Sequence, residues 1–368
     1  MDKKIKIAMI TSNLELNGIS SVIMNYCKNI DKKKFEIVIL AGSEVNEKIK
    51  EECKDLEIEI RELYSKRKSK LKYYISMFNA INKKEFDIFH VHGNSAIMAI
   101  DLMIAYFRGI KVRIAHSHNT VCSNPKIHRL LKPFFRRLYT QAFACGEDAG
   151  NWIFGKKNFC VINNGIQLEK FIYQEKNRKK IREKLNIKND EFLIGHIGRI
   201  NNQKNQLFLL DVFEKLCQRN DKEKLKLIFV GIGPLFEELK EKIKKSKYKD
   251  NIILYGETTE TESFYMAIDI FAFPSRYEGL PVTLIEAQAS GLKCLISDKI
   301  TNEIILTNLI TKISIDDEEI WINELEKYIK YEISGDSRSM NVDSFYKFDI
   351  KKNVRCLENY YKKFIKEV

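Results

Sequence analysis

The chain has 368 residues, enough for two domains that each bury their own hydrophobic core. Its eight cysteines include no C-x-x-C pair, which argues against a disulfide framework or a zinc knuckle. No apolar run approaches the roughly 18 residues that cross a bilayer, and the N-terminus enters a strand pattern directly. We therefore expect no membrane span, no signal peptide and a cytoplasmic location.

The net charge of +13 is concentrated in the first half of the chain. Residues 1–170 contain 29 Lys and Arg against 18 Asp and Glu, whereas the remainder contains 34 against 32. Such a field favours an anionic partner, namely membrane lipid, nucleic acid or a phosphorylated acceptor. A lysine-rich, proline-poor composition also arises from an AT-rich genome, so charge alone does not select the partner.

Short apolar or alternating runs, separated by helical patterns such as 22–29 and 234–245, predict two series of parallel strands. The first series comprises residues 6–11, 36–40, 57–60, 86–91, 113–116, 142–145 and 159–162. The second comprises residues 192–197, 226–230, 251–255, 270–273, 293–297 and 312–315. Between them lie Asn163-Asn164-Gly165 and the charged stretch 174–189, which fit a domain boundary.

Each series predicts a doubly wound, Rossmann-like α/β domain. We place the first domain at residues 1–170, the second at 171–345 and a C-terminal segment at 346–368. Apolar residues at helical spacing predict a packed helix in that last segment. Ligands of such sheets bind at the carboxyl ends of the strands, so the active site is expected in a cleft between the two domains.

The most informative segment lies between Glu278 and Glu286, directly after the strand-like run 269–275. It begins with Gly279, Leu280, Pro281, Val282 and Thr283. This turn leaves backbone amides unpaired where a helix begins, and those amides attract anions together with the helix dipole. A diphosphate fits there, with hydroxyl groups held by the two carboxylates. An acidic pair that merely complements the helix dipole explains the spacing equally well.

A second candidate site follows the first strand of the second series. Gly198 and Arg199 stand there, and Lys204 comes five residues after Arg199. A bidentate guanidinium and an ammonium can share one diphosphate, although a solvated basic loop has the same composition. Gly231 and Gly233, after the next strand, allow the backbone to approach a ligand, but they do not form a G-x-G-x-x-G fingerprint.

In the first domain, Asn17 and Gly18 follow the first strand. Both residues tolerate a positive φ, so their loop can bend sharply and offer N–H groups to an anion or an acceptor. An ordinary strand-to-helix turn accounts for the same residues.

Four histidines form two H-x-H pairs at the ends of expected strands, His90 with His92 and His116 with His118. Strand alternation places both members of a pair on one face. No carboxylate or cysteine completes an evident ligand set, so we predict no metal site. His118 is expected to form hydrogen bonds in the cleft, whereas His90 and His128 are interpreted as structural.

Residues 126–138 combine an apolar helical stripe with five basic residues and no acid. This pattern is typical of a helix on a membrane surface, but a stripe that faces the core has the same spacing. Residues 61–72, with six basic residues and one acid, form a second basic patch or a solvated face.

Together these segments resemble the retaining glycosyltransferases of the GT-B fold, in the large family 4 that makes bacterial polysaccharides and glycolipids. The resemblance covers nearly the whole chain. Its specific parts are Gly198-Arg199 with Lys204, and the segments 231–234, 269–275, 278–286, 162–166 and 115–120. It implies two Rossmann-like domains facing across a cleft, and a C-terminal helix that packs back toward the first domain.

The resemblance also implies roles for individual residues. Arg199 and Lys204 would hold the donor diphosphate, Glu278 the transferred sugar and Glu286 the ribose. Backbone amides of residues 279–283 would support the phosphates and the sugar, His118 would reach the donor, and the loop of Asn17 and Gly18 would border the acceptor. Two departures stand out, because the family often has Gly-Gly at Asn17-Gly18 and commonly an aspartate at Gln167.

The expected function is retaining transfer of a hexose-type sugar from a nucleotide-sugar, with UDP as the leading carrier, to a saccharide or lipid-linked acceptor in capsule or exopolysaccharide synthesis. No metal or other cofactor is expected, and the basic first domain suggests peripheral attachment to the inner face of the membrane. A nucleotide-sugar 2-epimerase of the same fold is the alternative, which the E-x7-E arrangement disfavours. A nucleic-acid-binding protein is motivated by charge alone, and we expect no nucleic-acid partner.

Overall fold

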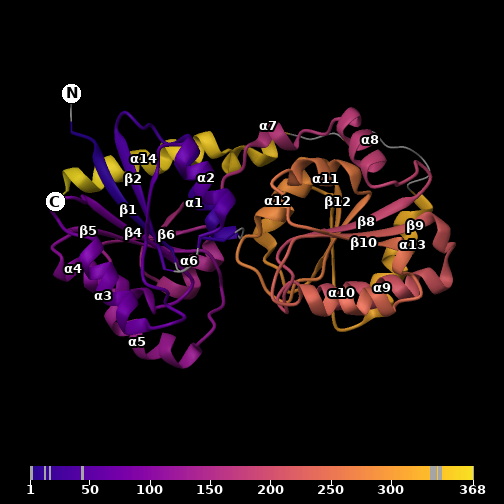
Figure 1. Ribbon diagram of the computed structural model, residues 1–368, viewed down its shortest axis with the longest axis horizontal. Coiled ribbons are helices and arrows are strands. Elements are labelled where there is room, and N and C mark those ends of the chain that lie inside the picture. Colours follow the sequence, from indigo (N-terminus) through magenta and orange to yellow (C-terminus); the bar gives the residue numbers. More distant parts are fainter. Residues whose placement is uncertain are drawn as a thin grey trace. The chain divides into compact units, whose positions relative to one another are not determined.

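The computed structural model describes residues 3–11, 14–15, 18–42, 45–331, 338 and 342–367. The chain forms two compact units (Figure 1). Unit 1 comprises Met1–Ile166 and Lys347–Val368, and unit 2 comprises Gln167–Tyr346. These limits differ by at most four residues from the boundaries drawn from the sequence, and they assign the C-terminal segment to unit 1.

Unit 1 is built on a seven-stranded parallel sheet with the order β3-β2-β1-β4-β5-β6-β7. Its strands are β1 (Ile5–Thr11), β2 (Phe35–Ala41), β3 (Glu59–Glu62), β4 (Ile88–Gly93), β5 (Val112–Ser117), β6 (Gln141–Ala144) and β7 (Cys160–Val161). The strand order reverses between β1 and β4, which is where ligands bind in such sheets.

Helices cover both faces of this sheet (Figure 1). They are α1 (Gly18–Asn29), α2 (Glu47–Asp55), α3 (Lys70–Ala80), α4 (Met98–Phe107), α5 (Pro125–Leu138), α6 (Glu147–Phe154) and α14 (Ile350–Lys366). On one side α3, α4 and α5 lie next to one another, and on the other side α14 packs against α1.

The C-terminal helix α14 is an integral part of unit 1, as expected. Its buried residues are Ile350, Asn353, Val354, Leu357, Tyr361 and Phe364. The amide of Asn353 donates to Asn163 O at 2.9 Å. A Cβ on Gly165 would lie 2.7 Å from Ile350 Cα, so a side chain there would prevent this close approach.

Unit 2 contains a six-stranded parallel sheet with the order β10-β9-β8-β11-β12-β13. Its strands are β8 (Phe192–Ile197), β9 (Leu225–Val230), β10 (Ile252–Gly256), β11 (Ile270–Phe273), β12 (Lys293–Ser297) and β13 (Ile310–Ile313). Its helices are α7 (Leu168–Phe171), α8 (Glu175–Lys184), α9 (Gln206–Arg219), α10 (Phe236–Lys245), α11 (Thr261–Ala267), α12 (Val282–Ala289) and α13 (Glu318–Tyr331). The order again reverses once, between β8 and β11.

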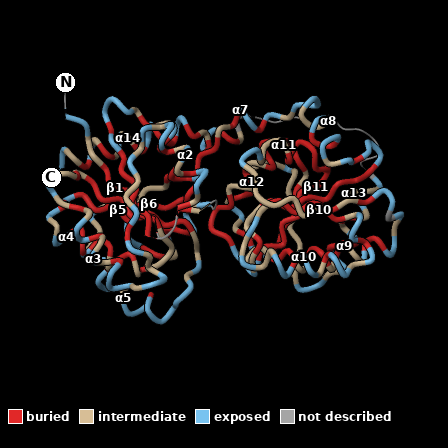
Figure 2. The backbone as a smooth tube through the Cα atoms, viewed as in Figure 1, coloured by how far each residue is buried: buried red, intermediate tan, exposed pale blue. Residues whose placement is uncertain are grey.

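Buried backbone follows the strands of both sheets (Figure 2). All thirteen expected strands are present, and three of them begin two residues away from the expected position. β4 begins at Ile88 rather than at residue 86. β3 begins at Glu59 rather than at residue 57 because Glu57 has a φ of 54°, which ends the preceding helical segment. β13 begins at Ile310 rather than at residue 312.

Two helices begin at other positions than the sequence indicated. α1 begins at Gly18, four residues before the expected start, and α10 begins at Phe236, two residues after Pro234. Leu235 N donates to Ile200 O at 3.2 Å, so residues 234 and 235 form a turn that contacts the neighbouring loop. In the described part of the chain, no helix has the length and apolar character needed to span a membrane.

Candidate functional site

Three glycines fix the loop that follows β8 against the loop that follows β9. A Cβ on Gly231 would lie 2.2 Å from Gly198 O, and a Cβ on Gly233 would lie 2.2 Å from Ile200 O. Gly231 also has a φ of +135°, which side chains rarely allow. Ile200 N donates to Ile232 O at 3.0 Å. The predicted donor-site glycines thus set the backbone on either side of Arg199, and contact with a donor stays a prediction.

Lys204, which is partly buried, and the buried Glu278 form an ion pair in unit 2. Lys204 Nζ lies 2.7 Å from Glu278 Oε1, and the side chains are 14% and 8% exposed. The ammonium also lies 4.5 Å from the ring centroid of Phe273, and Lys204 N donates to Asn201 Oδ1 at 2.9 Å. The pair joins two motifs that are more than seventy residues apart in sequence, and it holds a cation at the carboxyl ends of β8 and β11.

Further contacts connect the same two loops. Arg276 Nη2 donates to Asn205 Oδ1 at 3.0 Å, and Arg276 N donates to Gln203 O at 2.8 Å. Asn205 has a φ of 61° and directly precedes α9. Neither Arg276 nor Asn205 was among the site residues predicted from the sequence. The available signal was weak, since asparagine is one of the few residues that tolerate a left-handed conformation before a helix.

The N-terminus of α12 lies where the E-x7-E segment predicted it, with Val282 as the first helical residue. Pro281 precedes the helix, and its side chain provides no cap. Within the described part of the chain, the buried hydroxyls of Thr283 and Ser275 have no hydrogen-bond partner. Burying an unpaired hydroxyl is costly, so these groups indicate a place for a polar ligand.

Glu286 lies on α12, slightly more than one turn after its start. Its Oε2 accepts a hydrogen bond from the hydroxyl of Tyr265, a fully buried residue of α11, at 2.8 Å. Burial raises the pKa of Glu286 to about 7, and the hydrogen bond from Tyr265 opposes this shift. No pattern in the sequence indicated Tyr265 as the partner of this carboxyl.

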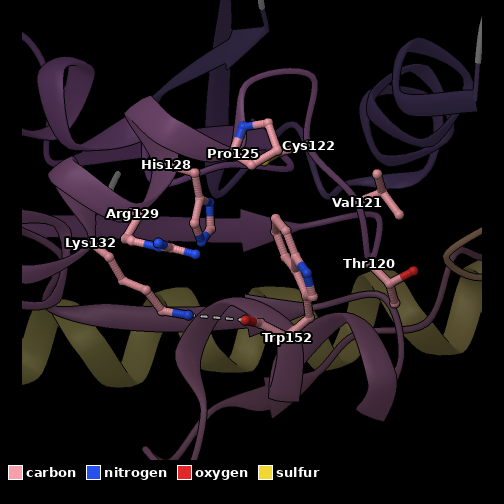
Figure 3. Close-up of a pocket in the computed structure, with 8 residues that line it drawn as sticks. All are labelled: Thr120, Val121, Cys122, Pro125, His128, Arg129, Lys132 and Trp152. Atoms are coloured by element: carbon pink, nitrogen blue, oxygen red, sulfur yellow. Dashed lines mark hydrogen bonds between the residues drawn. The ribbon is translucent and has the colours of Figure 1, made fainter.

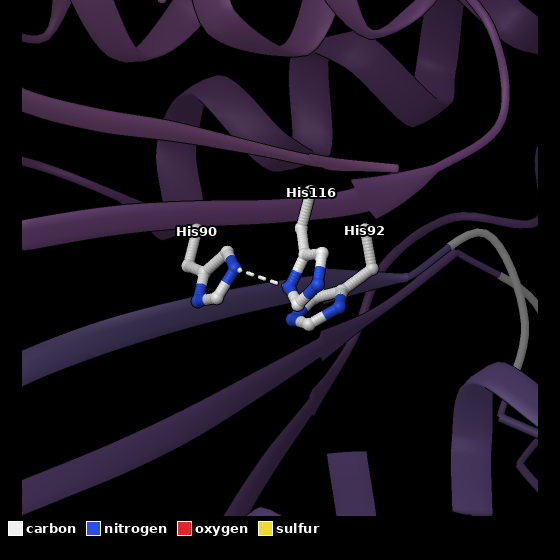
Figure 4. A group of neighbouring side chains, drawn as sticks. All are labelled: His90, His92 and His116. Carbon is white, nitrogen blue, oxygen red and sulfur yellow. Dashed lines mark hydrogen bonds between the residues drawn. The ribbon is translucent and has the colours of Figure 1, made fainter. Parts of the chain in front are cut away.

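The four histidines form a buried, stacked array in unit 1, and Figure 4 shows three of them, His90, His92 and His116. His92 lies opposite His116 in the β4–β5 register. His90 Nε2 lies 3.2 Å from His116 Nδ1, His92 Nδ1 lies 2.9 Å from His118 Nε2, and His90 Nδ1 lies 2.7 Å from the Tyr361 hydroxyl. Alternation therefore places each pair on one face, as predicted.

Burial determines the charge of this array. It lowers the pKa of His90 to about 3 and that of His118 to about 4, and it lowers the pKa of His92 and His116 well below the usual value. The imidazoles are therefore neutral at pH 7. His90, His92 and His116 place three ring nitrogens within 4.8 Å of one another, a spacing compatible with a metal ion as well as with the observed hydrogen bonds. The absence of a metal stays a prediction.

The predicted acceptor loop is only partly described. Asn17 lies outside the described residues. Gly18 opens α1, and a Cβ on it would meet no atom within 4 Å. Contact of this loop with an acceptor stays a prediction.

The apolar stripe of residues 126–138 lies mostly at the surface. On α5 only His128 and Phe135 are buried, whereas Leu130 is 70% and Phe134 is 59% exposed. The neighbouring helices α3 and α4 expose Leu71, Ile75, Phe78, Met103, Tyr106 and Phe107. Asp101 is the only acid in the three helices, and it is buried. We call this apolar and basic surface of α3, α4 and α5 the outer face.

Two models of known protein families match the chain. The family model for glycosyl transferases group 1 matches residues 177–343, and that for glycosyltransferase family 4 matches residues 16–170. The putative glycosyltransferase EpsF of Bacillus subtilis is 31% identical over 338 residues, 88% of this chain and 87% of that protein.

Two further proteins are similar. The UDP-Gal:alpha-D-GlcNAc-diphosphoundecaprenol alpha-1,3-galactosyltransferase of Escherichia coli is 26% identical over 273 residues, 70% of this chain and 68% of that protein. The crystal structure of Anabaena Alr3699/HepE in complex with UDP-glucose matches with a TM-score of 0.81 at 14% identity, covering 97% of this chain and 99% of that one.

Two doubly wound units with these strand orders, and the match to HepE, define the GT-B fold, which confirms the fold expected from the sequence. The chain belongs to glycosyltransferase family 4.

Proposed function

We propose that this glycosyltransferase moves a hexose-type sugar from a UDP-sugar to a saccharide or lipid-linked acceptor in cell-surface polysaccharide synthesis, with retention of the anomeric configuration and without a divalent metal. The observation that carries the proposal is the ion pair of Lys204 and Glu278 beside the N-terminus of α12 and the loop of Arg199. The E. coli relative is named for a UDP-galactose donor and a lipid-diphosphate acceptor, and HepE was crystallised with UDP-glucose.

Donor binding follows from the charges and hydroxyls of unit 2. Arg199, Lys204 and the amides at the start of α12 bind the diphosphate, and the unpaired Thr283 hydroxyl donates to one of its oxygens. In its ionised form, Glu286 accepts hydrogen bonds from the ribose hydroxyls. Tyr265 supports this, because its hydrogen bond fixes one carboxylate oxygen and leaves the other for the ligand.

In the transfer step, the bond between the anomeric carbon and the diphosphate oxygen breaks, and its electron pair stays on the diphosphate. Arg199, Lys204 and the α12 dipole stabilise the growing negative charge, which is the largest contribution expected from a preorganised site. The acceptor hydroxyl attacks from the same face, and the departing diphosphate takes its proton. Glu278 neutralises Lys204 before the donor arrives, so we assign it to the sugar hydroxyls rather than to nucleophilic attack.

The two basic side chains make a divalent metal unnecessary in this proposal. Dialysis against EDTA should leave transfer unchanged, measured with labelled UDP-sugar, and loss of activity that is restored by added Mg²⁺ or Mn²⁺ would contradict it. A role for His118 at the donor stays a prediction. As a neutral imidazole, it can donate or accept a hydrogen bond without adding charge.

We also propose peripheral attachment to the cytoplasmic side of an anionic membrane through the outer face. Exposed apolar side chains alternate there with lysine and arginine, and the lack of an exposed acid makes an anionic bilayer the complementary partner.

Alanine substitution of Arg199, Lys204 and Glu286, one at a time, tests the proposed function. We expect each variant to transfer sugar at least about 100-fold more slowly, since removal of one such charge-stabilising group typically costs about 10²–10³. Lys240→Ala, at an exposed position on α10, is the matched control. Full activity in all three variants, each shown to be folded by circular dichroism, would exclude the proposed site.

A sugar-nucleotide epimerase is the remaining alternative, and family membership favours transfer. Incubating UDP-N-acetylglucosamine with the enzyme and no acceptor separates the two. Conversion to a 2-epimer would identify an epimerase, whereas the transferase should yield only unchanged donor or slow hydrolysis.

A further inference from the structure

Gln206 is a buried polar residue that lies outside the predicted site residues. It is 1% exposed and is the first residue of α9, directly after the loop that carries Arg199 and Lys204. Its side chain bonds to residues before the helix rather than to α9 itself. A buried primary amide has to satisfy two donor protons and one acceptor oxygen, so its partners show what it holds in place.

The side-chain amide of Gln206 connects three groups of unit 2. Nε2 donates to Arg199 O at 3.0 Å and also lies 3.1 Å from His196 Nε2. Oε1 accepts from Asn201 N at 3.3 Å. One amide therefore fixes the backbone on both sides of Ile200, and this includes the carbonyl of the arginine that we assign to the donor diphosphate.

The hydrogen-bonding role of His196 follows from its other neighbour. His196 Nδ1 lies 2.9 Å from Ala272 O, and a carbonyl oxygen can only accept, so Nδ1 carries the proton. Burial lowers the pKa of His196 to about 3, so the ring is neutral at pH 7 and Nε2 accepts from Gln206. An inverted amide would place Oε1 against two acceptors, so only one orientation of Gln206 satisfies both neighbours.

His196 connects β8 to β11 where their backbone pairing ends. The last pair in the register between the two strands is Gly195 with Phe271. His196 is the next residue of β8, and its side chain donates to Ala272 O, on the next residue of β11. The strand order of unit 2 reverses between these strands, and ligands bind at such a position. The bond therefore sets the spacing of the two strands that lead to the donor loops.

The same network contacts the second cation of the predicted donor site. The ring of His196 stacks on that of Phe273 with centroids 5.6 Å apart, and Lys204 Nζ lies 4.5 Å from the centroid of Phe273. Lys204 is also held by its ion pair with Glu278. The position of the Arg199 backbone is thus what depends most directly on the amide.

We propose that Gln206 is a positioning residue for sugar transfer: supported by His196, its amide holds the backbone of Arg199 so that the guanidinium meets the diphosphate of the departing UDP. The proposal rests on the proposed function, because it concerns the residue assigned there to the leaving group. Gln206 acts through Arg199 and is assigned no contact with the substrate. Misplacing such a group by about 1 Å can cost about 100-fold in rate, so the bonds of one amide suffice for a large effect.

Gln206→Met tests the proposal, because methionine keeps the length of the side chain and removes its three hydrogen bonds. We expect kcat for transfer from a labelled UDP-sugar to fall at least about tenfold, with the acceptor KM within about twofold of the parent value. An unchanged kcat would overturn the proposal.

Substitution of His196 tests its supporting role. His196→Asn can still donate to Ala272 O, whereas His196→Phe cannot. The asparagine variant should therefore transfer sugar at least about threefold faster than the phenylalanine variant. Equal activities would show that the bond to β11 does not support Gln206, and would contradict this part of the proposal.

A double-mutant cycle with Arg199→Ala separates positioning from general damage. Once the guanidinium is absent, Gln206→Met has little left to displace, so it should slow the Arg199→Ala enzyme by no more than about threefold. An equal factor in the two backgrounds would overturn the proposal. Parent-like activity of the Arg199→Ala enzyme would instead refute the proposed donor site, whatever Gln206→Met does.

Gln288→Met is the matched control. Gln288 is fully buried on α12, and its amide also binds backbone, with bonds of 3.0 Å to Leu284 O and Ile304 O. It makes no printed contact with the loop of Arg199, so its loss should lower the stability of unit 2 without slowing transfer. Equal slowing in Gln206→Met and Gln288→Met would show that stability alone sets the rate, and would also overturn the proposal.

Tryptophan fluorescence measures the stability of unit 2 in these variants. The chain has two tryptophans, and Trp152 belongs to unit 1, where it lines a pocket beside α5 (Figure 3). Trp152→Phe therefore leaves Trp321 as the single reporter. The ring of Trp321 lies 5.7 Å from that of Phe208 on α9, so its fluorescence during urea unfolding follows the helix that Gln206 begins.

Discussion

The charged side chains of the donor region in unit 2 and of the outer face in unit 1 differ in whether they have a partner of opposite charge. In unit 2, Lys204 is paired with Glu278, and Asp269 is paired with both Arg178 and Arg182. In unit 1, the outer face carries lysine and arginine beside exposed apolar side chains and no exposed acid. A small diphosphate requires a few cations held in fixed positions, whereas an extended anionic surface requires cations that remain accessible.

The two units also differ in how their ligand loops are held. The loop of Arg199 in unit 2 is fixed by glycine contacts that leave no room for a Cβ. In unit 1, Gly18 has open space around its missing Cβ. Four experiments test this contrast, beginning with the largest expected effect.

Glu278→Ala should reduce transfer at least about 100-fold and destabilise unit 2 by about 2 kcal/mol, because it leaves the partly buried Lys204 without its counter-charge. Urea unfolding and a transfer assay measure the two effects. Glu319→Ala removes the carboxylate of an exposed pair with Arg219, and its cost should be far smaller because solvent screens this pair. Equal costs for the two variants would refute the distinction between the partly buried and the exposed pair.

Gly233→Ala should destabilise unit 2 by about 2 kcal/mol, because the new methyl group would lie 2.2 Å from Ile200 O. It should also displace Arg199 and weaken donor binding. Gly18→Ala, which meets no atom within 4 Å, should leave stability unchanged or slightly raised. Unfolding followed by Trp321 fluorescence in a Trp152→Phe background reports on unit 2 alone. A Gly233→Ala protein as stable as its parent would show that the loops readily separate.

Leu130→Ser with Phe134→Ser should weaken binding to vesicles of phosphatidylglycerol and phosphatidylcholine about 30-fold, since each side chain loses roughly 1 kcal/mol of apolar transfer on partial insertion. Co-sedimentation measures this binding. Ile305→Ser with Ile320→Ser changes similarly exposed residues of unit 2 and should have no effect. Binding that is independent of anionic lipid, or equal for both double variants, would exclude the outer face as the attachment surface.

The pH dependence of donor binding should be the smallest effect. The raised pKa of Glu286, about 7, means that ribose binding by its carboxylate strengthens as pH rises from 6 to 8, by up to about tenfold. Because the pKa of Glu286 is higher in the folded protein than in the unfolded chain, the folded state binds this proton more tightly. The stabilisation that protonated Glu286 provides is therefore lost as pH rises through 7. Calorimetry with a UDP-sugar, whose diphosphate does not titrate in this range, measures the binding. Glu286→Gln should flatten the profile, and an equally steep profile in this variant would assign the titration elsewhere.

The sequence predicts the fold well because strands of parallel sheets leave a local signature. Short, mainly apolar runs such as residues 270–273 and 293–297 identify β11 and β12 to the residue. The start of α12 was also predictable, since the Gly-Leu-Pro turn ends the preceding segment. Where a single residue adopts an unusual conformation, as Glu57 does before β3, the boundary shifts.

The candidate site was only partly predictable, because its pairings join distant segments. The sequence identified Lys204, Glu278 and Glu286 individually, yet nothing local indicates that Lys204 contacts Glu278 or that Tyr265 contacts Glu286. Likewise, the spacing of the apolar residues on α5 is the same for a buried and an exposed stripe. Only the packing of Phe135, with Leu130 and Phe134 left exposed, shows which residues of that stripe reach the core.

The position of α14 has a consequence for biosynthesis. Unit 2 is an insertion within unit 1, since residues 347–368 return to the first unit after the second is complete. All of unit 2 therefore leaves the ribosome before α14, and it can fold while unit 1 still lacks this helix. Until then, His90 lacks the hydroxyl of Tyr361, and the apolar surface that α14 will cover is open to solvent. We expect a chain that stops before residue 347 to need chaperones or to aggregate, although it contains every residue that we assign to the donor.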